Sequence, residues 1–79
     1  MKTRHDDLKH VTYYGDAPIR DHGGYGVDTS VQDGTNLLGL KVALDASMRK
    51  GIRADLNPTE VAELRDRCDA FLQDHQEPK

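Results

Sequence analysis

Few of the residues that could carry chemistry lie at spacings that would bring them together. The four histidines are scattered, and the closest two, His5 and His10, are not the four residues apart that place two ligands on one face of a helix. Cys68 has no second cysteine with which to bind a metal or form a disulfide. Ser30 and Ser47 lie in no recognisable catalytic motif. We therefore expect no metal, no cofactor and no catalytic constellation, and we predict that the protein is not an enzyme.

The glycine-rich segment 23–26 could be taken for a loop that cradles a phosphate. A Walker loop, however, needs a lysine after its last glycine, and none follows here. Asp21 and Asp28 flank the segment with negative charge, so we interpret it as a flexible connector. Tyrosines beside Gly, Asp and Ser are also typical of loops that bind proteins. Recognition of a protein partner is therefore the alternative, and the residues that would carry it are Tyr13, Tyr14 and Tyr25.

Length and charge exclude several broad classes. The chain has 79 residues, 35% of them hydrophobic and 32% charged, which is enough for one small domain but too little for a deep catalytic cavity. Eleven basic and fourteen acidic residues give a net charge of −3, with both signs spread along the chain. This balance gives no indication of a nucleic-acid-binding surface. No apolar run approaches the roughly 20 residues of a membrane span. We expect a cytoplasmic protein, in the host cytoplasm if it is viral.

The first 34 residues are predicted to be irregular and loop-rich. Five of the seven glycines lie there, together with Pro18, and they leave no room for a long helix between Gly15 and Gly34. His10–Tyr14 is rich in β-branched and aromatic residues and could form part of a short strand pair. Thr3–Lys9 could instead begin with a helical turn.

Residues 35–50 are predicted to form the first of two helices. Leu37, Leu40, Leu44 and Met48 recur at helical spacing and form one apolar stripe. A second stripe lies well round the cylinder and consists of Leu38, Val42 and Ala46. Gly51 follows as a residue that would end the helix. Gly39 would destabilise this helix by about 1 kcal/mol relative to alanine.

The second helix is predicted over residues 58–75. Asn57 can cap it, Pro58 suits the first helical position, and Glu60 can return a bond to the cap amide. We expect Cys68 to be packed in the core, because it lies on a single apolar stripe with Val61, Leu64, Phe71 and Leu72. The segment Gly51–Asn57 would connect the two helices. The fold class is thus mainly α: one domain over residues 1–79, with an antiparallel helical hairpin at 35–79.

The second stripe of residues 35–50 is the main indication of function. The N-terminal half could cover this stripe through Val11, Tyr13, Ile19, Val27 or Val31. Alternatively, the stripe stays exposed and binds another protein or a second copy. The predicted binding residues are therefore Tyr13, Tyr14, Tyr25, Leu38, Val42 and Ala46.

We predict a non-enzymatic protein-binding module: an adaptor, inhibitor or regulatory accessory of a larger protein, of the kind that phages and mobile elements encode. The alternative is a transcription-associated or nucleic-acid-linked factor that uses the basic residues Lys2, Arg4, Lys9 and Arg20. A helix-turn-helix is disfavoured, because the exposed face of the last helix carries several acidic residues that would meet phosphates. A protein partner or self-association is expected, without membrane or metal.

Overall fold

The computed structural model describes residues 1–75, which form a six-stranded antiparallel sheet followed by a single helix. The elements in chain order are β1 (Thr3–Asp6), β2 (Val11–Tyr14), β3 (Ile19–Arg20), β4 (Gly26–Gln32), β5 (Leu38–Ala43), β6 (Gly51–Leu56) and α1 (Pro58–His75). The strands pair in the order β1-β2-β4-β5-β6, and β3 pairs with the part of β4 that β2 leaves free. The predicted mainly α fold class is therefore wrong.

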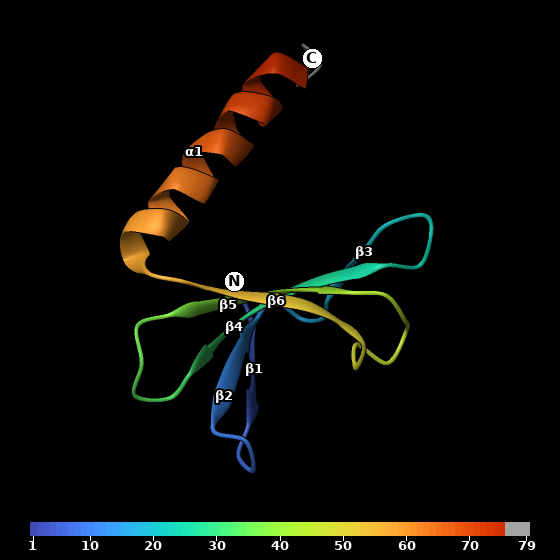
Figure 1. Cartoon of the computed structure of the whole chain (residues 1–79), viewed down its shortest axis with the longest axis vertical. Helices are drawn as coiled ribbons and strands as arrows, with labels where there is room; N and C mark the ends of the chain where they lie inside the picture. Colours follow the sequence, from blue (N-terminus) through green and yellow to red (C-terminus); the bar gives the residue numbers. More distant parts are fainter. Residues whose placement is uncertain (76–79) are drawn as a thin grey trace.

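The sheet is strongly twisted, and the helix stands away from it. In Figure 1, β4, β5 and β6 cross the molecule while β1 and β2 turn downward, and α1 rises from the end of β6. Within the described residues, α1 contacts the sheet mainly at β6, and it rises away from there (Figure 1). The chain therefore has one folded layer and a helix that covers little of it.

The helix predicted over residues 35–50 does not exist. Leu38, Leu40 and Val42 satisfy helical spacing in part, but they also alternate with three other residues at period two. Strand pairing decides between a helix and a strand here, because β5 forms register pairs along its whole length with β4 on one side and β6 on the other. Gly39, a weak point for a helix, lies in the middle of this strand.

The same alternation appears in two segments that were interpreted as non-regular. Residues 51–56, predicted to connect two helices, form β6, whose apolar positions alternate with glycine and charged residues. The N-terminal half, predicted to be irregular, contains β1 to β4. The residues considered for a short strand, 10–14, include β2, but this strand belongs to the larger sheet. Thr3–Lys9 begins with β1 and not with a helical turn.

The helix predicted from Pro58 is confirmed, and it begins with the expected capping box. The Asn57 side chain accepts a hydrogen bond from the Glu60 amide at 2.9 Å, and the Glu60 carboxylate accepts one from the Asn57 amide at 2.8 Å. The predicted antiparallel partner helix is missing, so α1 has no buried residue among those described. Cys68, expected in the core, is exposed.

The described part of the chain has a very small core. Between residues 1 and 75, Val11 and Ala43 are the only buried apolar side chains, and no large side chain is fully enclosed. The accessible surface is 6451 Å², whereas a compact protein of 8.8 kDa exposes about 4,800 Å². Subtracting about 700 Å² for four fully extended residues, to allow for those outside the described range, still leaves an excess of about 1,000 Å². No helix in this part of the chain combines the length and the apolar character needed to cross a membrane.

Candidate functional site

The alternation of the strands gives the sheet two faces of opposite character. Register pairs place Val27 beside Val42 and Val42 beside Ile52 on one face. We call this the apolar face, and its residues are Ile19, Val27, Val31, Leu38, Leu40, Val42, Ile52 and Leu56. The opposite, polar face carries Arg4, Tyr13, Asp28, Ser30, Lys41 and Arg53. Each face presents a different kind of binding surface.

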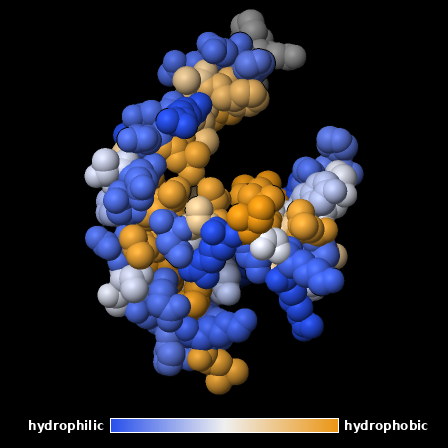
Figure 2. Space-filling view, in the orientation of Figure 1, coloured by the Kyte–Doolittle hydropathy of each residue, from blue (hydrophilic) through white to orange (hydrophobic). Residues whose placement is uncertain are grey.

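The apolar face is left open to solvent at one end. Ile19 is 73% exposed, Val42 44% and Ile52 77%, so a contiguous part of β3, β4, β5 and β6 is uncovered. On α1, Phe71 is 59% exposed and Leu72 56%. Figure 2 shows hydrophobic surface on the helix and on the sheet, on the two sides of a hollow between them. We call this hollow the apolar cleft.

The base of the apolar cleft is formed where α1 leaves the sheet. A cavity of about 530 Å³ lies there, and Pro58 and Val61 of α1 line it together with Tyr14, Val31, Thr35, Asn36, Leu37 and Leu38. Only Asn57 separates β6 from α1, and its amide and side chain are both held by Glu60. This short, bonded junction fixes the direction in which α1 leaves the sheet, so the far end of the helix stands off the apolar face.

Three of the six predicted binding residues are on the side of the apolar cleft. Leu38 and Val42 lie on the apolar face of β5, although as strand residues and not on a helical stripe. Tyr14 lines the base of the cleft and is 39% exposed.

The other three predicted binding residues lie elsewhere. Tyr13 is on the polar face, where the Arg4 guanidinium lies 5.1 Å from its ring centroid. Ala46 is in the β5–β6 loop, and its carbonyl accepts a hydrogen bond from Arg20 at 2.8 Å. Tyr25 is 49% exposed beside the β3–β4 turn. The tyrosines therefore do not form one binding loop.

The five residues proposed to cover the second stripe do not do so. Ile19, Val27 and Val31 lie in the same sheet face as Leu38 and Val42, beside these residues and not over them. The remaining two, Val11 and Tyr13, project from the opposite face.

The glycine-rich segment is an ordered turn whose amides are already occupied. Asp21 accepts hydrogen bonds from the amides of Gly23 and Tyr25, both at 2.9 Å, through one carboxylate oxygen. Its own amide donates to the Tyr25 carbonyl at 3.0 Å. Gly24 takes a φ of +89°, which the turn requires and which other residues rarely adopt. A phosphate cradle is therefore excluded here, because an internal carboxylate fills the place of the anion.

The polar face contains a cavity of about 550 Å³, which we call the basic cavity. Four cationic side chains line it: Lys9, Lys41, Arg49 and Arg53. Among residues 1–75, Asp28 is the one carboxylate in its lining, and it already pairs with Arg4 at 2.9 Å. The other lining residues are Val11, Tyr13, Ser30, Gln32, Ser47 and Met48.

The β5–β6 loop forms one wall of the basic cavity and is held in place. The Ser47 hydroxyl donates to the Asp45 carboxylate at 2.8 Å, and the Arg49 amide donates to it at 3.2 Å. The hydrogen bond from Ser47, followed by those from backbone amides, lowers the pKa of Asp45. Arg20 donates to the carbonyls of Asp45 and Ala46 at 3.3 and 2.8 Å. The loop is thus held by hydrogen bonds among its own residues and by hydrogen bonds from Arg20 of β3.

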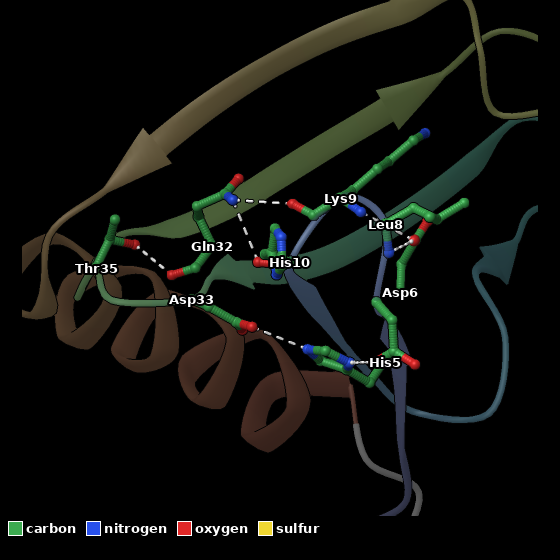
Figure 3. Close-up of polar contacts among 9 residues, drawn as sticks. His5, Asp6, Leu8, Lys9, His10, Gln32, Asp33 and Thr35 are labelled. Carbon is green, nitrogen blue, oxygen red and sulfur yellow. Dashed lines mark hydrogen bonds and ion pairs between the residues drawn. The ribbon is translucent and has the colours of Figure 1, made fainter.

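The turn between β1 and β2 places Lys9 at the rim of the basic cavity. Figure 3 shows Asp6 accepting from the amides of Leu8 and Lys9, while the Gln32 side chain donates to the carbonyls of Lys9 and His10. The two latter bonds measure 2.9 and 3.2 Å. These hydrogen bonds hold the β1–β2 turn against the end of β4.

His5 adds a second connection between β1 and the end of β4. Its ring nitrogens lie 2.9 Å from the Asp33 carboxylate and 2.7 Å from the Asp7 carboxylate (Figure 3). The hydrogen bond with Asp33, and then that with Asp7, raises the pKa of His5. Among the described residues, no group of three or more His, Cys, Asp or Glu side chains is arranged to hold a metal ion.

The sequence interpretation missed Lys41, Arg49 and Arg53. Their common face becomes visible only when residues 38–43 and 51–56 are aligned as paired strands, which places Lys41 opposite Arg53. Two of the basic residues that the sequence suggested contact other parts of the chain. Arg4 pairs with Asp28, and Arg20 donates hydrogen bonds to carbonyls of the β5–β6 loop.

A scan against protein-family models and searches of curated proteins and of solved structures find no match to this chain. The functional argument therefore depends on the surfaces described above.

Proposed function

We propose that the chain is a non-enzymatic protein-binding module, of the adaptor, inhibitor or regulatory accessory kind, and that it acts as a dimer formed through the apolar cleft. One observation carries the proposal. Within the described residues, the far end of the apolar stripe of α1 and one end of the apolar face of the sheet are both exposed, and they border the same hollow. Exposed, contiguous apolar surface of this kind is typical of protein interfaces.

A second copy of the chain is the occupant that we propose for the apolar cleft. The cleft offers a helix stripe and a sheet face, so two copies can each lay α1 on the partner's sheet in one two-fold arrangement. Eighteen residues make α1 about 27 Å long, which spans the roughly 14 Å from strand β2 to strand β6. The sheet of the same chain is a poor alternative, because the junction at Asn57 directs the helix away from it.

The surface area supports this occupant. The excess of about 1,000 Å² over a compact protein is similar to the roughly 800 Å² that each partner buries in a stable interface. A reciprocal helix exchange would therefore bring the exposure of each chain close to that of an ordinary folded protein.

Light scattering over a concentration series tests the proposal. We expect the weight-average mass to rise with concentration from 8.8 kDa toward about twice that value. Replacing Ile52 on the apolar face by lysine should abolish the rise, because it would bury a charge. Leu8→Lys is the matched control, since Leu8 is 93% exposed in the distant β1–β2 turn. A mass of 8.8 kDa at every concentration, or equal effects of the two variants, would contradict self-association.

The nucleic-acid-linked alternative loses two of the four basic residues on which it was based. Arg4 and Arg20 hold other parts of the chain, and only Lys9 of the four basic residues lines the basic cavity.

A further inference from the structure

We propose that the basic cavity on the polar face binds a phosphate-bearing ligand of the nucleotide type, either a free nucleotide or the backbone of a single-stranded nucleic acid. This site is on the opposite face of the sheet from the apolar cleft, so it is independent of self-association. The argument depends on the charge of the cavity, its construction and its dimensions.

The charges that line the cavity are not balanced within the described residues. Asp28 lies opposite Lys41 in the register, but its carboxylate is bonded to Arg4 at 2.9 Å. Asp55 pairs with Arg53 at 3.1 Å from the exposed rim, and both side chains are about half exposed. The remaining excess is about three positive charges, which one carboxylate ligand would not neutralise. Two or more phosphate groups would neutralise it.

One pair of residues indicates that this imbalance belongs to a binding site. Lys41 and Arg53 are direct cross-strand partners on the polar face. Like charges in such positions repel and destabilise a sheet. A bound anion between them would convert this repulsion into two attractive contacts.

Gly39 allows the arginine to lie against the floor of the cavity. The guanidinium atoms of Arg53 come within 2.6 to 2.9 Å of the point where a Cβ atom would stand at residue 39. Any side chain there would therefore displace Arg53. The neighbouring floor residue Ser30 is only 7% exposed and pairs with Gly39 across the strands. The planar guanidinium thus has room to lie in the cavity, and with its Nε bonded to Asp55 at 3.1 Å it has further donors for phosphate oxygens.

The dimensions and remaining lining of the cavity favour a nucleotide. Its volume of about 550 Å³ falls within the range of about 300–1,000 Å³ typical of small-molecule sites. Tyr13 and Met48 supply aromatic and polarizable surface against which a base can pack. The net charge of −3 hides this site, because the acidic excess of the chain is in the helix: residues 58–75 contain five acidic and two basic side chains.

Calorimetry on the full chain tests the site with three probes: sodium pyrophosphate, ADP and a single-stranded oligothymidylate. Binding of pyrophosphate and ADP without tight oligonucleotide binding indicates a free nucleotide. Tighter oligonucleotide binding that weakens steeply with salt indicates a nucleic-acid chain. Either result supports the proposal. The absence of binding by all three probes at millimolar concentration would overturn it.

A pair of variants locates the site. Lys41→Gln should weaken pyrophosphate binding about 10-fold or more, because it removes a charge-assisted contact. Lys50→Gln, an identical change in the neighbouring loop at a residue that does not line the cavity, should alter binding less than about twofold. Equal weakening by the two variants would mean diffuse attraction and would also overturn the proposal.

The ligand-free stability gives a second, independent measurement. Because Lys41 faces Arg53, the Lys41→Gln protein without ligand should melt at the same temperature as the original protein or higher. Pyrophosphate should raise the melting temperature of the original protein more than that of the variant, at matched concentration and ionic strength. A lower melting temperature in the ligand-free variant would contradict the repulsion argument.

Discussion

Phe71 is the residue of α1 whose removal should affect self-association most clearly. Burying a phenylalanine from full exposure contributes about 1.5–3 kcal/mol. Its side chain is 59% exposed, so an interface can still gain about 0.9–1.8 kcal/mol from each copy. In a two-fold dimer this doubles to about 1.8–3.5 kcal/mol, and Phe71→Ala should raise the dimer dissociation constant roughly 20-fold to 400-fold.

Sedimentation velocity over a concentration series measures that constant directly. Leu8→Ala is the matched control, because Leu8 is a large exposed hydrophobic residue far from the apolar cleft. Circular dichroism of both variants checks that α1 is retained, as expected for a side chain without buried neighbours. The reasoning is refuted if Phe71→Ala changes the dissociation constant no more than Leu8→Ala does.

Three further predictions concern a titration, a cap and a thiol. The hydrogen bonds with Asp33 and then Asp7 raise the pKa of His5, so its protonated form stabilises the fold below the unfolded pKa of about 6.5, and this contribution is lost as pH rises through the folded pKa. Melting temperature should therefore fall as pH rises above about 6.5, and it should fall less in His5→Gln. Identical profiles would refute the role of Asp33 and Asp7. Asn57→Ala should cost about 1 kcal/mol in the free energy of unfolding, measured with urea, and an unchanged midpoint would show that the capping box is dispensable. Cys68 should react readily with maleimide in dilute protein and more slowly at concentrations where the mass has doubled; a rate independent of concentration would place α1 outside the interface.

Local signals in the sequence were sufficient to predict α1 but not the sheet. Asn57, Pro58 and Glu60 act within one turn, so the start of α1 could be read without knowledge of the rest of the chain. Residues 38–43 carry both helical and alternating spacing, and the choice was made by hydrogen bonds to β4 and β6, which are distant in sequence. Non-local pairing of this kind leaves little trace in a single segment.

The candidate site could be predicted only in part, because it also depends on strand pairing that is distant in sequence. Leu38 and Val42 were chosen as exposed apolar residues, and they are on the open apolar face, but the stripe that suggested them was helical. The basic cavity was missed because Lys41 and Arg53 meet only through the register of β5 and β6. Tyr13 was grouped with Tyr14, although consecutive strand residues point to opposite faces.

An isotope-filtered NOE experiment tests the central claim most directly. Labelled and unlabelled chains are mixed, so that only contacts between two copies give signals. The account predicts cross-peaks between the Phe71 ring and the methyl groups of Val42 and Ile52 in the mixed sample. If these contacts appear only within a single labelled chain, or in neither sample, then a second copy does not fill the apolar cleft.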